Sequence, residues 1–288
     1  MSLGRIDAHQ HFWRYVPSEY DWIDDSLSPL RRDFLPADLE PALRAAGFDA
    51  CVAVQARQTL EETRFLLDLA DRAPFVAGVV GWIDLRSDHV SQQLDALDAG
   101  RGRRKLVGLR HVVQSEPDDR FLMGPGFRRG VARAQEAGLA YDILIHARHL
   151  SVAVEFAERL EGARLVLDHL GKPDIRAGEI RDWERGLRAL ARCPHVMAKL
   201  SGLVTEADWR TWTPEDLRPY LDVAFDAFGY ERLMIGSDWP VCTVAADYPR
   251  TMEIVIHYLR DRPASEQDAV LGGNAARFWR LDLKEGQA

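Results

Sequence analysis

The chain has 288 residues, of which 47% are hydrophobic and 28% charged, the composition of an ordinary globular protein with a sizeable core. Its formal net charge of −8 argues against nucleic-acid binding, which needs a clustered basic surface. Three cysteines do not suggest a disulfide framework, and the chain lacks a signal-peptide segment or a run of about 20 apolar residues, so we expect a cytoplasmic protein that does not bind membranes.

Eight short segments rich in apolar and β-branched residues recur along the chain. Most of them are nearly continuous apolar runs, the pattern of parallel strands that are covered on both faces. The predicted strands are Arg5–His9, Ala50–Gln55, Phe75–Trp82, Leu106–Val112, Tyr141–His146, Arg164–His169, His195–Leu200 and Leu233–Asp238.

Helical patterns separate these strands and close the chain. The predicted helices are Pro36–Ala46, Leu60–Arg72, Val90–Leu97, Gly126–Ala137, Leu150–Leu160, Trp183–Ala191, Pro214–Phe228, Thr251–Arg260 and Glu266–Arg277. Strands that alternate with helices eight times indicate βαβ units, and their spacing favours a closed barrel over an open sheet. We therefore predict an α/β fold, a single (β/α)8 TIM barrel that spans residues 1–288.

The longest irregular stretch is residues 13–35. Long loops inside a compact domain are usually functional or disordered, and the aromatic residues of this stretch argue against disorder. We expect it to form a wall or lid over the mouth of the barrel. The alternative is a surface loop that packs on a neighbouring helix.

Two histidines end the first predicted strand, in the sequence Asp7-Ala8-His9-Gln10-His11. Side chains two residues apart on a strand point the same way, so His9 and His11 should both face the barrel mouth, where barrel enzymes place their chemistry. Two such imidazoles could share a metal ion, clamp one oxyanion or form a structural pair. Asp7 is expected to orient a neighbouring histidine.

Polar residues also end the later strands. They are Gln55, Arg110, His111, His146, Asp168, His169, Lys199 and Asp238. Arg110 is a candidate substrate clamp, although a buried cation could equally belong to a structural ion pair. Lys199 could likewise be a salt-bridged lysine of the interior. Asp238, a carboxylate at the mouth of the last strand, is a candidate base for water.

The ordered set of strand-end motifs resembles the amidohydrolase superfamily, specifically its amidohydrolase-2 branch. Within that branch the chain is similar to the group of sugar lactonases that contains the L-fuconolactonases and L-rhamnonolactonases. The resemblance runs from about Arg5 to Trp279. The motifs that carry it are Asp7–Trp13, Val54–Ala56, Gly108–His111, Leu167–Pro173, Lys199–Trp209 and Gly236–Pro240.

The resemblance implies hydrolysis of the lactone ring of a sugar acid. In that reaction Asp238 would take a proton from the attacking water, and His9 and His11 would polarise the carbonyl, directly or through a divalent metal. His169 would orient the water or bind the carbonyl. The residues implied to contact the sugar hydroxyls or ring are Gln55, Arg110, His111 and Trp239.

The sequence is compatible with a site that binds a metal ion and with one that does not. A two-metal site of the superfamily usually has a bridging lysine or glutamate at strand four, where this chain has Arg110 and His111, so we expect no binuclear centre. A single ion, with zinc the favoured metal, could be held by His9, His11, His146 and Asp238. The lactonase branch also includes metal-free enzymes, so a cofactor-free mechanism is equally compatible.

Two other functions fit the same motifs. The amidohydrolase-2 branch contains zinc-dependent decarboxylases, although Lys172-Pro173 and the segment Lys199–Trp209 favour a lactonase. A non-catalytic barrel that binds a sugar acid is the second alternative, but such a protein would not need to retain His9, His11 and Asp238. The expected partner is a small sugar lactone, and the sequence does not define the sugar or the oligomeric state.

Overall fold

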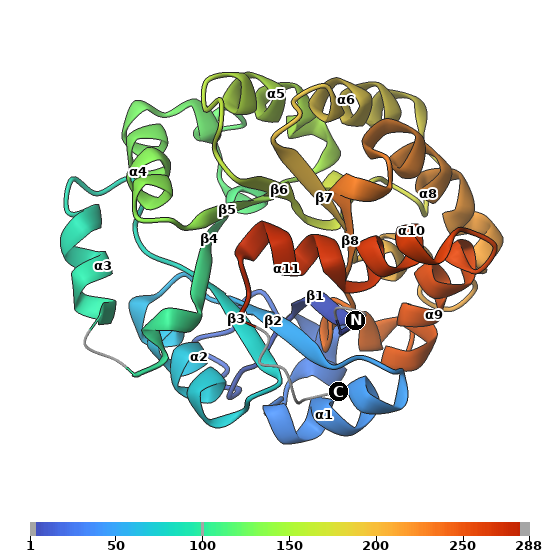
Figure 1. The fold of residues 1–288 in the computed structure, drawn as a ribbon, viewed down its shortest axis with the longest axis horizontal. Coiled ribbons are helices and arrows are strands. Elements are labelled where there is room, and N and C mark those ends of the chain that lie inside the picture. The colour runs from blue at the N-terminus through green and yellow to red at the C-terminus, as the bar shows by residue number, and fades with distance from the viewer. Residues whose placement is uncertain (1–3, 99–100, 283–288) are drawn as a thin grey trace.

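The computed structural model describes residues 4–98 and 101–282. Eight strands form one parallel sheet whose order follows the chain from β1 to β8 (Figure 1). The strands are β1 Ile6–Gln10, β2 Ala50–Val54, β3 Val76–Gly81, β4 Leu106–Val112, β5 Ala140–Leu144, β6 Leu165–Leu167, β7 Val196–Leu200 and β8 Leu233–Ile235. Each strand overlaps a predicted one, and the prediction of a (β/α)8 barrel is confirmed.

Backbone hydrogen bonds join the first strand to the segment after the last one. The His11 amide donates to the carbonyl of Trp239 over 2.6 Å, and the Asp238 amide donates to the carbonyl of His9 over 2.8 Å. Gln10 and Trp239 form a parallel bridge at the same place. We call this junction the seam of the barrel, and it lies at the carboxyl ends of both strands.

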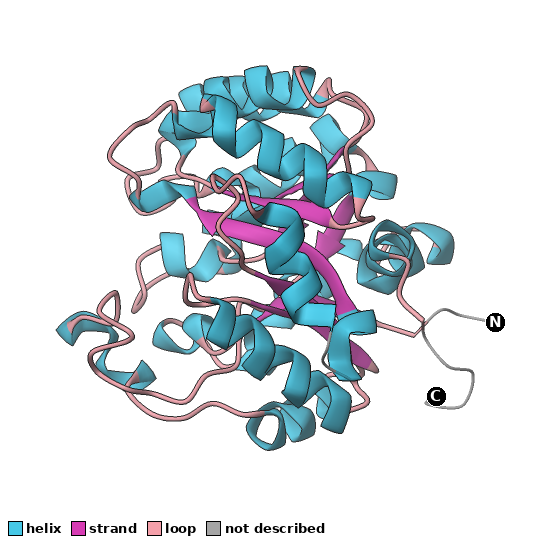
Figure 2. Ribbon diagram, turned by 90° about the vertical axis from the view of Figure 1, so that its left-hand side faces the viewer, coloured by secondary structure: helices cyan, strands magenta, loops and turns pink. Residues whose placement is uncertain are grey.

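Helices surround the strands on the outside of the barrel (Figure 2). Among residues 4–98 and 101–282, no helix combines the length and the apolar composition that a membrane crossing requires. The helices are α1 Pro36–Ala45, α2 Leu60–Arg72, α3 Val90–Asp98, α4 Pro125–Glu136, α5 Leu150–Glu158, α6 Arg181–Ala191, α7 Leu203–Glu206, α8 Pro214–Phe228, α9 Tyr248–Leu259, α10 Ala264–Asp268 and α11 Asn274–Trp279.

The apolar core has two parts. The larger part fills the layer between the strands and the surrounding helices. The smaller part lies inside the barrel, where side chains of the strands, such as Ile6 and Val52, pack against Phe278 and Trp279 of α11. Helix α11 lies across the strands in Figure 1 and closes the end of the barrel where the strands begin. Polar side chains lie at the opposite end of the barrel, where the strands end.

The last predicted helix, Glu266–Arg277, is interrupted in the structure. Between α10 and α11 the chain forms one wide π-helical turn, Ala269–Gly273. A side chain at Gly272 would bring its Cβ within 2.3 Å of the Gly4 carbonyl oxygen, so only glycine lets this turn pack against the start of β1. A helical periodicity does not reveal this close approach of two backbones.

The sixth strand ends earlier than predicted, at Leu167 instead of His169. After Asp168, four consecutive residues, 169–172, have φ between 51° and 71°, in the left-handed region. We call residues 169–172 the left-handed turn. It bends the chain sharply away from the strand direction and places His169 at the barrel mouth.

Candidate active site

A bulge in β1 determines which side chains of that strand face the mouth. The register against β2 shifts between Asp7 and Gln10, which interrupts the usual alternation. Gln10 donates to the Cys51 sulfur over 3.3 Å, on the side away from the mouth. His9 and His11 lie together, with 3.2 Å between their Nε2 atoms. Both histidines are buried, with exposed fractions of 0% and 4%.

Asp7 fixes the backbone behind the histidines. One of its carboxylate oxygens accepts the amide of His9 (3.1 Å) and that of Ser237 (2.9 Å), and the other accepts the Ser237 hydroxyl (2.6 Å). Burial raises the pKa of Asp7 to about 6, although these hydrogen bonds act in the opposite direction. Asp7 therefore ties β1 to the residue that precedes Asp238.

Asp238 stands at the centre of three imidazoles. Its Oδ1 lies 3.2 Å from His11 Nε2, 3.8 Å from His9 Nε2 and 3.9 Å from His169 Nε2. Burial alone would raise the pKa of Asp238, but the three histidines outweigh that effect and hold it below its ordinary value. Asp238 is therefore an ionised carboxylate at neutral pH, and it can accept a proton or bind a cation.

The donor atoms of this group fit a divalent metal ion. His11 Nδ1 lies 2.7 Å from the carbonyl of Val54, which can only accept a hydrogen bond, so the proton of a neutral His11 is on Nδ1. The lone pair of its Nε2 then faces Asp238 Oδ1, and two acceptors so close repel each other unless a proton or a cation lies between them. His9, His11 and Asp238 offer donor atoms within 4.8 Å of one another. Two imidazoles and a carboxylate are typical zinc ligands, and three protein ligands leave a position free for water.

His169 reaches the group from the left-handed turn. Its Nδ1 lies 2.9 Å from the Ser201 hydroxyl, which fixes the ring so that Nε2 faces Asp238. Gly202 packs directly against the ring, because a Cβ on that residue would lie 2.6 Å from His169 Nδ1. Burial lowers the pKa of His169 to about 4, so the ring is neutral at neutral pH.

A buried network of charges lies beneath His9. Asp168 contacts both Lys199 Nζ (2.9 Å) and Arg110 Nη1 (3.0 Å), and Lys199 Nζ also contacts Asp142 at 2.5 Å. His9 Nδ1 lies 3.4 Å from Asp168 Oδ1 and 3.2 Å from Lys199 Nζ. Burial opposes ionisation of Asp168, but Lys199, His9 and Arg110 outweigh it and keep its pKa well below the usual range. Burial raises the pKa of Asp142 to about 7, and Lys199 offsets only part of that increase.

A cavity of about 720 Å³ opens above this group. His11, Arg110, His169 and Asp238 line it at the barrel mouth, and the irregular segment 13–35 supplies a further part of its wall. Most of the other lining residues belong to the loops that follow the strands. The wall residues from the irregular segment are Ser18, Glu19, Asp21, Trp22 and Leu27, and those from the loops include Arg57, Gln114, Lys172, Thr205 and Glu206.

Three residues expected to contact the sugar are not among those that line this cavity. Gln55 is fully buried, and its backbone and side-chain oxygens accept hydrogen bonds from Arg110. His111 lies against Glu116 and Trp82, at 2.7 Å and 3.2 Å. Trp239 packs against the aromatic rings of Phe12 and Phe34. The geometry gives these three side chains roles in supporting the walls and, for Gln55, in holding Arg110.

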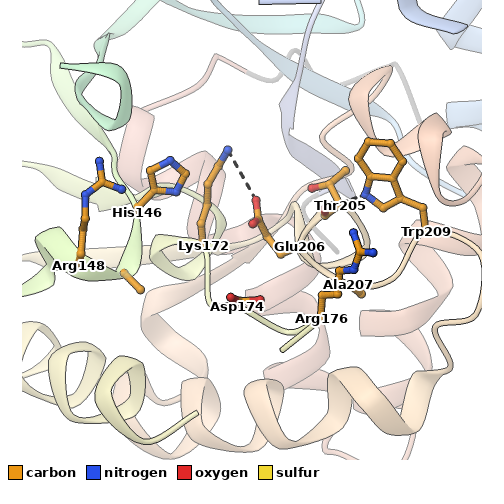
Figure 3. A pocket seen from close by; sticks show the side chains of 10 residues that line it. His146, Arg148, Lys172, Asp174, Arg176, Thr205, Glu206, Ala207 and Trp209 are labelled. Carbon is orange, nitrogen blue, oxygen red and sulfur yellow. Dashed lines mark hydrogen bonds and ion pairs between the residues drawn. The ribbon is translucent and has the colours of Figure 1, made fainter. Parts of the chain in front are cut away.

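The structure also places His146 outside the group formed by His9, His11 and Asp238. Strand β5 ends at Leu144, and a 3-10 turn over Ala147–His149 follows at once. His146 lines a neighbouring pocket together with Lys172, as Figure 3 shows. Burial lowers its pKa to about 4. Among the described residues, the possible metal ligands form two overlapping groups, His9 with His11 and Asp238, and His9 with Asp168 and His169, and His146 belongs to neither.

Some residues of the site were not predicted from the sequence. Asp142 is a carboxylate in the middle of an otherwise apolar strand, and this position was the available signal, because a buried charge requires a partner. Ser201 and Gly202 follow β7 in a motif with no recognised chemical role. Their function becomes visible only when the barrel brings them beside His169.

The chain matches the amidohydrolase family over residues 6–281. An L-fucono-1,5-lactonase of Burkholderia multivorans is 45% identical, over 98% of this chain and 97% of the relative. The L-fucono-1,5-lactonase of Burkholderia ambifaria is 38% identical, with the same coverage. A crystal structure of an amidohydrolase from Burkholderia multivorans with bound zinc is 44% identical and superposes with a TM-score of 0.92, covering 97% of this chain and 100% of that one. The chain therefore belongs to the amidohydrolase family.

Proposed function

We propose that this protein is a lactonase that opens the ring of a sugar-acid lactone of the L-fucono-1,5-lactone type. The observation that carries the proposal is the ionised carboxylate of Asp238, set among three histidines at the base of a cavity. Acyl transfer to water needs a base beside a site for the carbonyl, together with groups that stabilise the negative charge that develops on its oxygen. Two relatives that match nearly the whole chain are named for this reaction.

The residues divide the reaction between them. The Asp238 carboxylate takes a proton from water as its oxygen attacks the lactone carbonyl. When the bond between the acyl carbon and the ring oxygen breaks, the same proton passes to that ring oxygen, which leaves as a hydroxyl group. The acid product then ionises and releases a proton to solvent. His169 orients the water, and the Arg110 guanidinium, which lines the cavity, binds a substrate oxygen.

We further propose that one divalent metal ion, with zinc favoured, is held by His9, His11 and Asp238. The convergence of their donor atoms and the zinc bound in the similar crystal structure support this assignment. When bound, the ion would polarise the carbonyl and favour ionisation of water. His9 and His11 then serve to hold it. Asp168 and the Val54 carbonyl orient the two imidazoles, and Asp7 holds the backbone of His9.

The size of the cavity and the residues that line it indicate the class of substrate. Its volume of about 720 Å³ suits a single sugar-sized molecule. We propose that residues 13–35 form a wall over the mouth of a one-domain barrel, since five of them line the cavity. We also propose a cytoplasmic enzyme with no nucleic-acid partner, in keeping with the net charge of −8.

The alternatives receive less support. A zinc-dependent decarboxylase could use the same fold, but two relatives that match nearly the whole chain, at 45% and 38% identity, are L-fucono-1,5-lactonases. A non-catalytic sugar-acid-binding barrel would leave the buried Asp238 without a purpose.

A panel of sugar lactones, assayed by proton release in a weakly buffered pH indicator, tests the function. We expect hydrolysis of L-fucono-1,5-lactone, and a fall in kcat of about 1,000-fold in Asp238→Asn, because the amide cannot accept the proton. Circular dichroism verifies that the variant is folded. Hydrolysis of no lactone, or near-wild-type kcat in Asp238→Asn, would contradict the proposal.

A further inference from the structure

A second pocket of about 440 Å³ adjoins the catalytic cavity. The two share the side chains of Lys172, Thr205 and Glu206 as a common wall. Lys172 and Glu206 form an ion pair at 3.6 Å across this boundary, the dashed contact in Figure 3. Any molecule that leaves the catalytic cavity on this side passes the Lys172 ammonium group.

The charges of the second pocket favour an anion. Its lining carries three cations, Arg148, Lys172 and Arg176, and the two carboxylates of Asp174 and Glu206. Arg148 already has a partner outside the pocket, with 3.2 Å between its Nε and Asp119 Oδ1. Among the residues that the structure describes, no ion pair engages the guanidinium of Arg176. Its charge also acts on the carboxylate of Asp208, which lies beyond contact distance.

The remaining wall suits a carbon chain with hydroxyl groups. The indole of Trp209 lines the pocket beside Arg176 (Figure 3), and its Nε1 donates to the Thr205 carbonyl over 2.9 Å, which fixes the ring. An aromatic face packs against C–H groups, while the lysine and arginine bind carboxylate and hydroxyl oxygens. The pocket thus combines an apolar platform with cationic groups at its edge.

We propose that this second pocket binds the open-chain polyhydroxy carboxylate that lactone hydrolysis produces, an inference that rests on the proposed function. The lactone is uncharged, whereas its product carries a carboxylate. The cations of the adjacent pocket attract it, so the Lys172 boundary is the route by which the product leaves.

Glu206 and the product carboxylate compete for the Lys172 ammonium group at the boundary between the two pockets. Burial raises the pKa of Glu206 despite the ion pair with Lys172, so its carboxylate is only weakly held in the charged form. A product carboxylate that binds Lys172 replaces Glu206 as the partner of the ammonium group. The backbone carbonyl of Glu206 meanwhile accepts the amide of Arg176 over 3.0 Å, which keeps both cations on one rim.

Product inhibition tests the proposal. The probe is the sodium salt of the aldonic acid obtained by alkaline opening of L-fucono-1,5-lactone. Arg176→Met, which keeps most of the side-chain length and removes the charge, should raise the ratio of the product inhibition constant to the lactone KM about fivefold to tenfold. Arg64→Met, an equivalent change at an exposed arginine of α2, should leave the ratio at its wild-type value. An unchanged ratio in Arg176→Met overturns the inference.

Calorimetric titration separates this inference from the proposed function, because it measures binding without turnover. Wild-type protein should bind the aldonate at least about tenfold more tightly than acetate, which offers a carboxylate without the hydroxylated chain. Equal affinity for the two anions, or no binding of the aldonate, overturns the second pocket as a product site. Absence of lactone hydrolysis combined with normal aldonate binding would instead count against the lactonase function alone.

Discussion

Lys199 places an ammonium group in the closed interior of the barrel, where its exposed fraction is 0%. Asp142 and Asp168 balance its charge at 2.5 Å and 2.9 Å, and Arg110 provides a second cation for Asp168. The sequence indicated that Lys199 could be a salt-bridged lysine of the interior, and the structure shows these ion pairs. The network also contacts His9, so it links stability to the geometry of the site.

Removal of the Lys199 ammonium group should therefore lower the stability of the protein. Lys199→Met leaves two carboxylates buried with one cation, and we expect the free energy of unfolding to fall by about 3–5 kcal/mol. Adding Asp142→Asn removes the surplus negative charge and should recover part of that loss. Urea denaturation of both variants measures the effect. A loss of under about 1 kcal/mol in Lys199→Met would show that water or protonation compensates for the missing charge.

The loop after β7 packs against the loop after β6 and fixes the position of its histidine. Gly202 has φ of +69° and lies against the His169 ring. Gly202→Ala should displace that ring and lower kcat/KM at least about tenfold, because a small misplacement of a catalytic group is costly. Gly178→Ala is the matched control, since Gly178 has the same φ of +69° with no atom within 4 Å of its added Cβ.

Both alanine variants carry the same backbone strain and should lose about 1 kcal/mol of stability. Only Gly202→Ala should lose activity. Steady-state kinetics combined with thermal unfolding separates the two effects. Equal losses of activity in the two variants would show that strain, and not contact with His169, is responsible.

The loop between β2 and α2 depends on one buried carboxylate. Glu62, near the start of α2, accepts the amides of Ala56 (3.0 Å) and Arg57 (2.6 Å), and Arg57 lines the catalytic cavity. Burial raises the pKa of Glu62 to about 7 from an ordinary value of 4.5. The folded state therefore binds a proton that the unfolded state releases at intermediate pH.

The sign of the resulting pH dependence follows directly. The contribution of Glu62 is fully present below pH about 4.5, and it is lost as the pH rises towards about 7, by roughly 3 kcal/mol in total. In Glu62→Gln this part of the pH dependence should disappear. Urea denaturation at pH 5 and pH 8 measures the difference for both proteins. The same pH dependence in the variant and the wild type would contradict the assignment.

The elements were predictable to different degrees. Apolar runs located all eight strands, because a parallel strand covered on both faces leaves a clear pattern. The ends of β5, β6 and β8 were placed two or three residues too late, since a left-handed turn such as 169–172 depends on packing and not on periodicity. The same error displaced His146, which the sequence put beside His9 and the structure puts in the second pocket.

On the scale of the whole molecule, strand order determined which site residues could be foreseen. The sequence indicated His9, His11, His169 and Asp238 as candidates because the ends of parallel strands meet at one face of a barrel, and the structure brings these four side chains together. The neighbours that orient them could not be found in this way. The register shift between Asp7 and Gln10 and the contact between Gln55 and Arg110 arise only from the closed sheet.

Metal binding should stabilise the entire barrel, because the proposed ligands come from both ends of the chain. At a zinc concentration about 100 times the dissociation constant, we expect a gain of about 2.7 kcal/mol and a rise in Tm of about 5 °C over chelated protein. In His11→Ala the shift should vanish. Thermal unfolding monitored by circular dichroism measures it. An identical Tm with zinc and after verified metal removal would support a metal-free enzyme.

The seam can close only late in synthesis, because it joins β1 to the segment that follows β8. His11 and Asp238 are separated by 227 residues, so the ribosome makes one of them roughly 11–45 s before the other at about 5–20 residues per second. Throughout that interval β1 has an unpaired edge, and the nascent chain contains histidines without their carboxylate. The hydrogen bonds that finally close the sheet also bring Asp238 to His11. A chain that has not yet been made as far as Asp238 therefore lacks the proposed base, and closure of the sheet brings that base to its histidines.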